Sequence, residues 1–234
     1  MNIATQARLT GAVYLLYFVT AVVGALLAPG TGGPGGLPTD AAANAAGILA
    51  HETRYQVGVA IGLVSTVLYV ALAGLFYVLL RPVNRTLAVV MAFISVTGCA
   101  VTGFAAVFQL APVVILGGRP FLAVFDAHQL QSLALLFLYL GAEAGRVALA
   151  FFAFFQLVWG YLIFRSTFLP RIIGVLIAVA GVGWLALVLP APAPPVVTAI
   201  EVLGFVAEAS LMLWLLVMGV DARRWEALAK PASA

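Results

Sequence analysis

Long apolar runs, separated by short breaks rich in glycine, proline and polar residues, make up most of the chain. Several of these runs exceed the roughly 18 residues that an α-helix needs to cross a bilayer. They predict six membrane spans, at residues 9–28, 55–80, 86–115, within 127–164, 172–189 and 197–220. The pattern therefore predicts an all-α fold, a polytopic transmembrane helix bundle that forms a single integral membrane domain over residues 1–234.

Turn residues mark the breaks, as in "RPVNR" after the second run and "PAPAPP" before the last. Only the first loop, residues 29–54, is long. Its second half is rich in alanine, and Thr39 or Asp40 can cap the start of a helix there. We therefore predict an outer loop that contains a short surface helix. The tail, residues 221–234, contains Trp225, which is typical of an anchor at the membrane interface.

The segment from Ala127 to Arg165 is too long for one span. As a single α-helix it would run about 58 Å, whereas the hydrocarbon core of a bilayer is about 30 Å thick. Either one helix projects or bends, or two helices meet at "GAEAG", where Gly141 and Gly145 favour a bend. The first alternative gives six spans and a half-inserted outer approach helix, and the second gives seven spans.

The distribution of Lys and Arg favours six spans, because cytoplasmic loops are enriched in these residues. With six spans, only Arg54 and Arg119 lie outside, and Arg146 lies in or near the membrane. The residues then predicted on the cytoplasmic side are Arg8, Arg81, Arg85, Arg165, Arg171, Arg223, Arg224 and Lys230. With seven spans this bias reverses. We therefore predict a multi-pass protein with both termini in the cytoplasm and a cytoplasmic tail at residues 221–234.

The composition of the chain excludes several classes of function. The mean hydropathy of +1.17 is too high for a soluble protein, and the net charge of +3 comes without the basic block that binds nucleic acid. The single cysteine, Cys99, rules out disulfides within the chain and indicates a buried packing role. Walker, HExxH and GxSxG motifs are absent from the sequence. We predict no cofactor, and the sequence favours a non-enzymatic protein whose main partner is the lipid bilayer.

Glu143 and Arg146 interrupt a long apolar run. Their spacing of three residues places them on one helix face, where they can form an ion pair. Pairing lowers the cost of burying each charge, which amounts to several kcal/mol at the bilayer centre. A structural ion pair at the membrane boundary is the simplest interpretation, and a functional site is the alternative.

Glu201 and Glu208 lie seven residues apart in the last span and so share a helix face. At 1.5 Å per residue, Glu201 lies about 6 Å below the outer surface, level with Arg146, and Glu208 about 16 Å below it. With three glutamates and one arginine, the outer half of the membrane region would carry an excess of negative charge. Either a carboxyl group is protonated, or a cation or cationic ligand binds. Neutral partners predicted for Glu208 are Ser65, Thr66, Thr97, Thr102, Gln109, Gln129 and Gln156.

Both histidines, His51 and His128, fall on the outer side. His128 with Asp126 or Glu143 would make a partial metal site, but zinc needs three or four convergent ligands. Solvated histidines are therefore the better interpretation, and no metal is predicted. Gly58 and Gly62 form a small-xxx-small pattern, which predicts close helix packing within the chain.

Five segments span nearly the whole chain in order: "ARLTGAVYLLYFV", "YVLLRPVNRTLA", "HQLQSLALLFLYL", "GYLIFRSTFLPRIIGVLIAVAGVGWL" and "AEASLMLWLLVMGV". Together they resemble the bacterial membrane family catalogued as domain of unknown function 4386. The most specific element runs from Arg165 to Gly174. The resemblance implies a protein of the bacterial cytoplasmic (inner) membrane with six to seven helices and no assigned activity.

The resemblance also bears on the candidate site. Gln129, Gln131 and Glu208 match the family pattern, which implies a shared role for them. The family tends to carry a His-Gly-Tyr-Gly type of run where this chain has Gly141 to Gly145. Glu143 and Arg146 are therefore predicted to be particular to this protein.

Three hypotheses for the function follow from these residues. In the first, a non-enzymatic membrane protein binds a small ligand, a lipid or a membrane protein partner through an outer-half polar cluster. The predicted cluster comprises Glu143, Arg146, Glu201, Glu208, His128, Gln129 and Gln131. In the second, a transporter moves a small cation or proton-coupled solute with Glu208 as the titrating group. In the third, an outward-facing membrane enzyme uses Glu143, His128 or Glu208 as acid or base.

Overall fold

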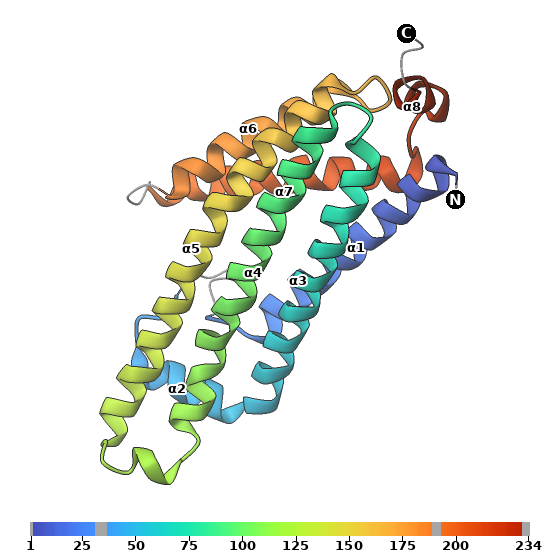
Figure 1. The fold of residues 1–234 in the computed structure, drawn as a ribbon. Coiled ribbons are helices and arrows are strands. Elements are labelled where there is room, and N and C mark those ends of the chain that lie inside the picture. Colours follow the sequence, from blue (N-terminus) through green and yellow to red (C-terminus); the bar gives the residue numbers. More distant parts are fainter. Residues whose placement is uncertain (1, 31–36, 189–192, 231–234) are drawn as a thin grey trace. The chain divides into compact units, whose positions relative to one another are not determined.

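The computed structural model describes residues 2–30, 37–188 and 193–230, and the regular elements in these ranges are all helical (Figure 1). Six helices are long and apolar enough to cross a membrane: α1 (Ile3–Leu27), α3 (Glu52–Leu80), α4 (Arg85–Leu116), α5 (Ala127–Arg165), α6 (Arg171–Val188) and α7 (Pro194–Val217). The shorter elements are α2 (Ala41–Ala50), η1 (Pro120–Leu122) and α8 (Ala222–Ala229). The prediction of a transmembrane helix bundle with six spans is confirmed.

The long segment is one helix, α5, of 39 residues. Its α-helical conformation continues through Gly141 and Gly145, so the predicted approach helix is the first part of α5 and not a separate element. Gly141 permits close packing, because a Cβ atom there would lie 3.3 Å from Cβ of Phe108 in α4. The small size of Gly141 thus serves a helix contact that the sequence did not predict.

Side-chain caps explain where the N-terminal helices begin. The Asp40 carboxylate accepts a hydrogen bond of 3.0 Å from the amide of Ala43, which confirms the short helix predicted in the first loop. In the same way Asn2 Oδ1 accepts a bond of 3.1 Å from the amide of Ala4. This cap lets α1 begin at Ile3, several residues before the apolar run that the sequence predicted as its start.

The chain forms two compact units. The first unit comprises Met1–Leu16, Leu68–Cys99 and Ala148–Ala234, and the second comprises Tyr17–Val67 and Ala100–Val147. Four helices, α1, α3, α4 and α5, contribute residues to both. The buried Cys99 belongs to the first unit, in agreement with its predicted packing role.

Aromatic side chains and close helix contacts make up the core of the first unit. Trp159, which is fully buried, has its ring centroid 4.6 Å from that of Phe76 and 5.0 Å from that of Phe155. Helices α5 and α6 touch backbone to backbone. A Cβ atom on Gly174 would lie 2.7 Å from the carbonyl oxygen of Gly160, a distance that no side chain can occupy.

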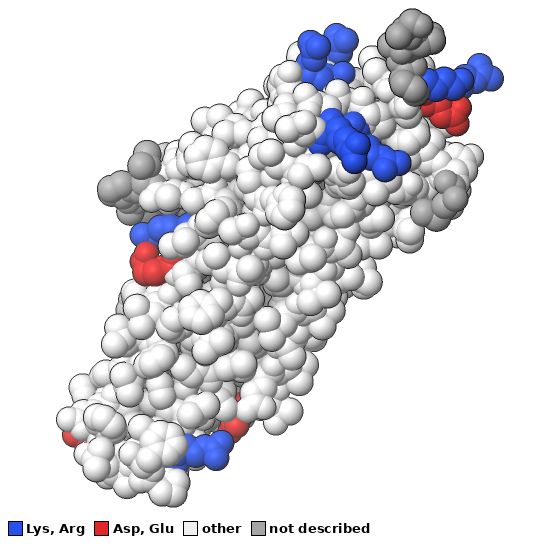
Figure 2. Space-filling model, viewed as in Figure 1, with Lys and Arg blue, Asp and Glu red and all other residues white. Residues whose placement is uncertain are grey.

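At one end of the first unit, α8 packs on the turns between the long helices. The indole nitrogen of Trp225 donates a hydrogen bond of 2.8 Å to the carbonyl oxygen of Leu79, and Arg224 Nη1 donates one of 3.0 Å to that of Thr167. Figure 2 shows Lys and Arg side chains gathered around this end. Basic residues therefore gather around this end of the first unit.

The second unit has a core of its own, made by Ala28, Ile48, Tyr55, Val59, Ala106 and Leu138. The hydroxyl of Tyr55 donates a hydrogen bond of 2.7 Å to the carbonyl oxygen of Gln109, which joins α3 to α4. Gly58 lets α1 and α3 meet, because a Cβ atom there would lie 2.6 Å from the backbone nitrogen of Ala28. The predicted packing role of this glycine is confirmed.

Candidate functional site

Glu208 in α7 accepts hydrogen bonds from two other helices. The Tyr14 hydroxyl of α1 donates to its Oε2 over 2.6 Å, and Nε2 of Gln156 in α5 donates to its Oε1 over 2.6 Å. Tyr14 is fully buried, Gln156 is 3% exposed, and Glu208 keeps partial exposure. The two donors therefore hold the carboxyl group between α1, α5 and α7 of the first unit.

Aromatic packing fixes the Tyr14 hydroxyl in position. The Tyr14 ring packs edge-on against Phe76, with centroids 5.7 Å apart, and lies 6.2 Å from the ring of Trp159. Since Phe76 and Trp159 are themselves buried, the ring has no room to swing away. The Glu208 carboxyl group thus faces a preorganised donor.

Neutral groups alone hold Glu208. The ion pairs of the described residues join Arg146 to Glu143 and Arg224 to Asp221, and neither involves Glu208. The side-chain nitrogen Nε2 of Gln156 can only donate, so Oε1 of Glu208 is the acceptor of this hydrogen bond. A proton on the carboxyl group would therefore sit on Oε2, facing the Tyr14 hydroxyl, which can donate or accept.

Two buried polar atoms near this cluster lack hydrogen-bond partners within the described ranges. They are Oε1 of Gln156, an acceptor, and Nε1 of Trp159, a donor. Both side chains come from α5, three residues apart and therefore on one face of that helix. Buried polar atoms without partners are uncommon in folded proteins, and a functional role is one of the explanations for them.

The predicted pair of Glu143 and Arg146 is confirmed, with 3.2 Å between the guanidinium and the carboxylate. Both side chains are more than half exposed, at 58% for Glu143 and 51% for Arg146. The pair lies on the surface of the second unit and satisfies its own charges.

The remaining predicted residues of the second unit do not form a site with Glu143. Gln129 and Asp126 cap α5 reciprocally: the Gln129 amide N–H donates to the Asp126 carboxylate over 2.8 Å, and the Asp126 amide N–H donates to the Gln129 side chain over 3.0 Å. His128 is exposed in the same turn, and Gln131 is partly buried. His128 lies about 22 Å from Glu143 along the same helix, so the two cannot act as an acid–base pair.

In the described part of the chain, no three His, Cys, Asp or Glu side chains converge, so these residues offer no set of metal ligands.

Glu201 is exposed on α7 and lies apart from the Glu208 cluster, although its spacing placed it on the same helix face as Glu208. The two acids differ because Glu208 is covered by Tyr14 and Gln156, whereas no described side chain bonds to Glu201.

Comparison with known families identifies the chain. Residues 9–219 match the model of a family described as a domain of unknown function (DUF4386). The chain belongs to the DUF4386 family. The matched region includes Tyr14, Gln156 and Glu208, and the description of the family assigns no activity. No curated protein and no solved structure matches the chain.

The structure also explains the segment that most resembles the DUF4386 family, Arg165 to Gly174. Ser166 is buried in the turn after α5, and its hydroxyl donates a hydrogen bond of 2.7 Å to the carbonyl oxygen of Ile163. Gly174 allows α6 to return against α5 at backbone distance. This segment therefore builds the tight connection between two spans.

Sequence reasoning included Gln156 among the partners of Glu208 but missed Tyr14 and Trp159. Tyrosine in an apolar helix resembles any aromatic packing residue, and only its hydroxyl marks it as a donor. The available signal was a general one: a carboxyl group within a span needs a donor, and tyrosine residues in other spans can supply it. Which tyrosine does so depends on the packing of helices far apart in the sequence.

Proposed function

We propose that this DUF4386 protein is a multi-pass protein of the bacterial cytoplasmic membrane that binds a small cationic ligand, such as an amine, at Glu208. One observation carries the proposal. A carboxyl group within an apolar span accepts hydrogen bonds from two neutral side chains, Tyr14 and Gln156, and pairs with no basic residue of the described chain.

A cationic ligand would supply the positive charge that pairs with an ionised Glu208. An ionised carboxylate within a bilayer costs several kcal/mol unless it is paired. Glu208 is partly exposed, and its two donors occupy one lone pair on each oxygen, so acceptor sites remain. The preorganised carboxyl group is thus suited to bind an ammonium group through charge-assisted hydrogen bonds.

Both termini are assigned to the cytoplasm in this proposal. Support comes from the basic residues that gather around α8, because cytoplasmic loops are enriched in Lys and Arg. Arg54 and Arg119, which belong to the second unit, are then the basic residues assigned to the outer side.

Native mass spectrometry of the gently solubilised protein tests the proposal. We expect a bound mass of an amine or other cation on the wild-type protein and none on Glu208→Gln. Glu201→Gln is the matched control, since it removes an acid from the same helix that forms no hydrogen bond with the described residues. Identical spectra for wild type and Glu208→Gln, or loss of the bound mass in Glu201→Gln alone, would contradict the assignment.

Proton-coupled transport is the second candidate, and the Gln156 amide favours it. Its Oε1 atom has no partner, so reversing the amide would offer an acceptor to a protonated Glu208 without losing another hydrogen bond. The Tyr14 hydroxyl likewise suits both states of the carboxyl group. The cluster can therefore hold either protonation state, as alternating binding of a proton and a cation requires.

Transport can be measured with radiolabelled guanidinium, which carries N–H donors, in proteoliposomes that carry a pH gradient. This permanently charged probe does not cross lipid unaided. We expect gradient-driven uptake by wild type and by Glu201→Gln, and none by Glu208→Gln. Uptake that matches protein-free vesicles in every case would rule out transport of this class of cation, while leaving the binding test above to decide the first proposal.

A further inference from the structure

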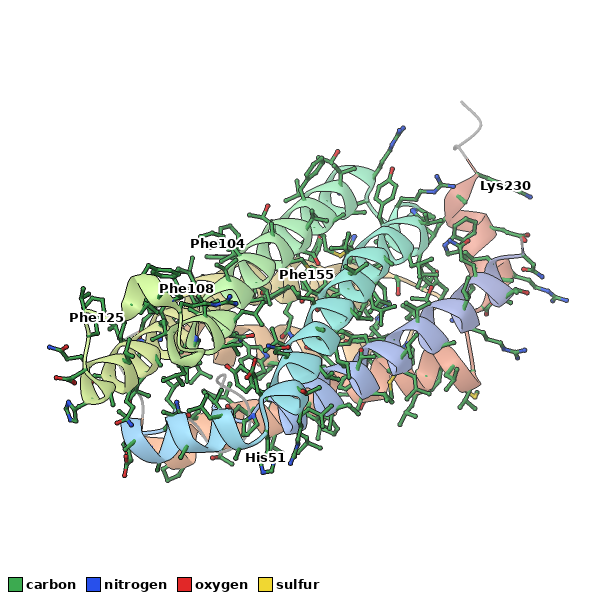
Figure 3. All side chains as sticks on the ribbon, turned by 90° about the horizontal axis from the view of Figure 1, so that it is seen from below. His51, Phe104, Phe108, Phe125, Phe155 and Lys230 are labelled. Atoms are coloured by element: carbon green, nitrogen blue, oxygen red, sulfur yellow. The ribbon has the colours of Figure 1, made fainter. Side chains whose placement is uncertain are left out.

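A second candidate site lies in the second unit, where α1 ends and α3 begins. A cavity of about 400 Å³ opens there, within the range of roughly 300–1,000 Å³ typical of ligand pockets. One face of α2 lines it through Asn44, Gly47, Ile48 and His51. Figure 3 labels His51 at the junction of α2 and α3. The cavity shares no residue with the Glu208 cluster.

Hydrogen-bond donors and positive charge line this cavity. Arg54 donates from Nη2 to the carbonyl oxygen of Leu26 over 3.2 Å, which fixes the guanidinium and uses one of its five N–H groups. His51 adds an imidazole. Asn44 also lines the cavity, but its amide nitrogen Nδ2 is buried and does not reach the cavity surface.

No acid belongs to the lining of this cavity as described. The nearest acids along the chain are engaged elsewhere. Asp40 caps α2 by accepting from the amide of Ala43, and Glu52 accepts a hydrogen bond of 3.0 Å from the Gln56 side chain. The lining is therefore suited to an anionic group, since Arg54 and His51 both offer N–H donors and no acid of the lining repels a negative charge.

The rest of the lining is apolar. Leu27, Pro29, Pro38 and Ile48 contribute hydrophobic surface. Tyr55 contributes its ring, because its hydroxyl is already bonded to the carbonyl oxygen of Gln109. The cavity also lies at the ends of two membrane spans, α1 and α3, where lipid head groups meet acyl chains.

We infer that this cavity binds an anionic amphiphile, with a carboxylate or phosphate head group at Arg54 and His51 and the first part of an acyl chain against Leu27 and Ile48. Free fatty acids and anionic phospholipids share this chemistry. The inference rests on the cavity alone, and it holds or fails independently of ligand binding at Glu208.

Gly47 provides a test that leaves the donors in place. A Cβ atom on Gly47 would meet no atom within 4 Å, so Gly47→Leu extends into the cavity without a backbone clash. Leucine also favours the helix more than glycine does, so α2 is expected to form. Gly47→Ala is the matched control, because it makes the same helix change while adding only one carbon atom.

Binding is measured by titrating the solubilised protein with the fluorescent fatty acid cis-parinaric acid. We expect wild type and Gly47→Ala to bind it alike, and Gly47→Leu to lose binding. Arg54→Gln is expected to bind about tenfold more weakly or worse, the loss of one charge-assisted hydrogen bond. Equal affinities in all four proteins would overturn the inference.

Competition identifies the ligand class. Displacement of the probe by laurate would assign the site to free fatty acids, and displacement by short-chain phosphatidylglycerol would assign it to anionic phospholipids. Equal displacement by uncharged dodecanol would show that the head group is not recognised. Displacement by inorganic phosphate at the same concentrations would show that no acyl chain is needed, and either of these last two results would overturn the inference.

Discussion

Gly174→Val is expected to lower the free energy of unfolding by about 3 kcal/mol, because overpacking of a rigid contact costs roughly this much. The new Cβ atom would lie 2.6 Å from the backbone nitrogen of Phe164 and 2.7 Å from the carbonyl oxygen of Gly160. Neither atom belongs to a side chain that can turn aside. Helix α6 must then move away from α5, which also opens the turn around Ser166.

Thermal unfolding of the solubilised protein measures this loss. A change of about 3 kcal/mol corresponds to a drop in Tm of roughly 6–12 °C for a chain of this size. Gly74→Val is the control, since a Cβ atom on Gly74 meets nothing within 4 Å and the same residue type is introduced into a span. A similar Tm for both variants would show that α5 and α6 can accommodate the added side chain without the predicted loss of stability.

Tyr14→Phe combined with Gln156→Leu is expected to destabilise the protein by about 2–5 kcal/mol. Each change removes a donor to Glu208, and a charged or polar group left without its partner costs about 1–3 kcal/mol. The Tyr14→Phe change keeps the ring that packs against Phe76 and Trp159, so the loss reports mainly on the hydroxyl.

Adding Glu208→Leu to that double variant should restore much of the lost stability. Replacing all partners of a polar cluster by apolar side chains is often nearly neutral, whereas leaving one behind is costly. Thermal unfolding of the double and triple variants decides the point. A triple variant less stable than the double would mean that Glu208 makes a favourable contribution without Tyr14 and Gln156, and the cluster would then not act as one unit.

Much of the fold was predictable because hydropathy alone identifies helices that cross a membrane. The six spans, the short helix capped by Asp40 and the packing glycine Gly58 all follow from local sequence. The continuity of α5 through Gly141 could not be predicted in this way, since a glycine permits both a bend and a close contact. The close contact depends on the position of Phe108 on the neighbouring helix, which the sequence does not give.

The candidate site was predictable only in part. The cost of a carboxyl group within a span singled out Glu208, and the same argument suggested Gln156 among several neutral partners. The pair of Glu143 and Arg146 followed from helix spacing, but its exposure did not. Tyr14 depends on how the first and last spans pack, and a single sequence carries no record of that contact.

The hydrogen bond between Tyr14 and Glu208 joins residues separated by 194 positions in the chain. At typical rates of about 5–20 residues per second, synthesis of that stretch takes roughly 10–40 s. During this time α1 has already been synthesised, but the Tyr14 hydroxyl does not yet have the Glu208 carboxyl group as its partner. The nascent protein must therefore keep its first helix close to the insertion site, or bring it back, before the last span can be stably placed.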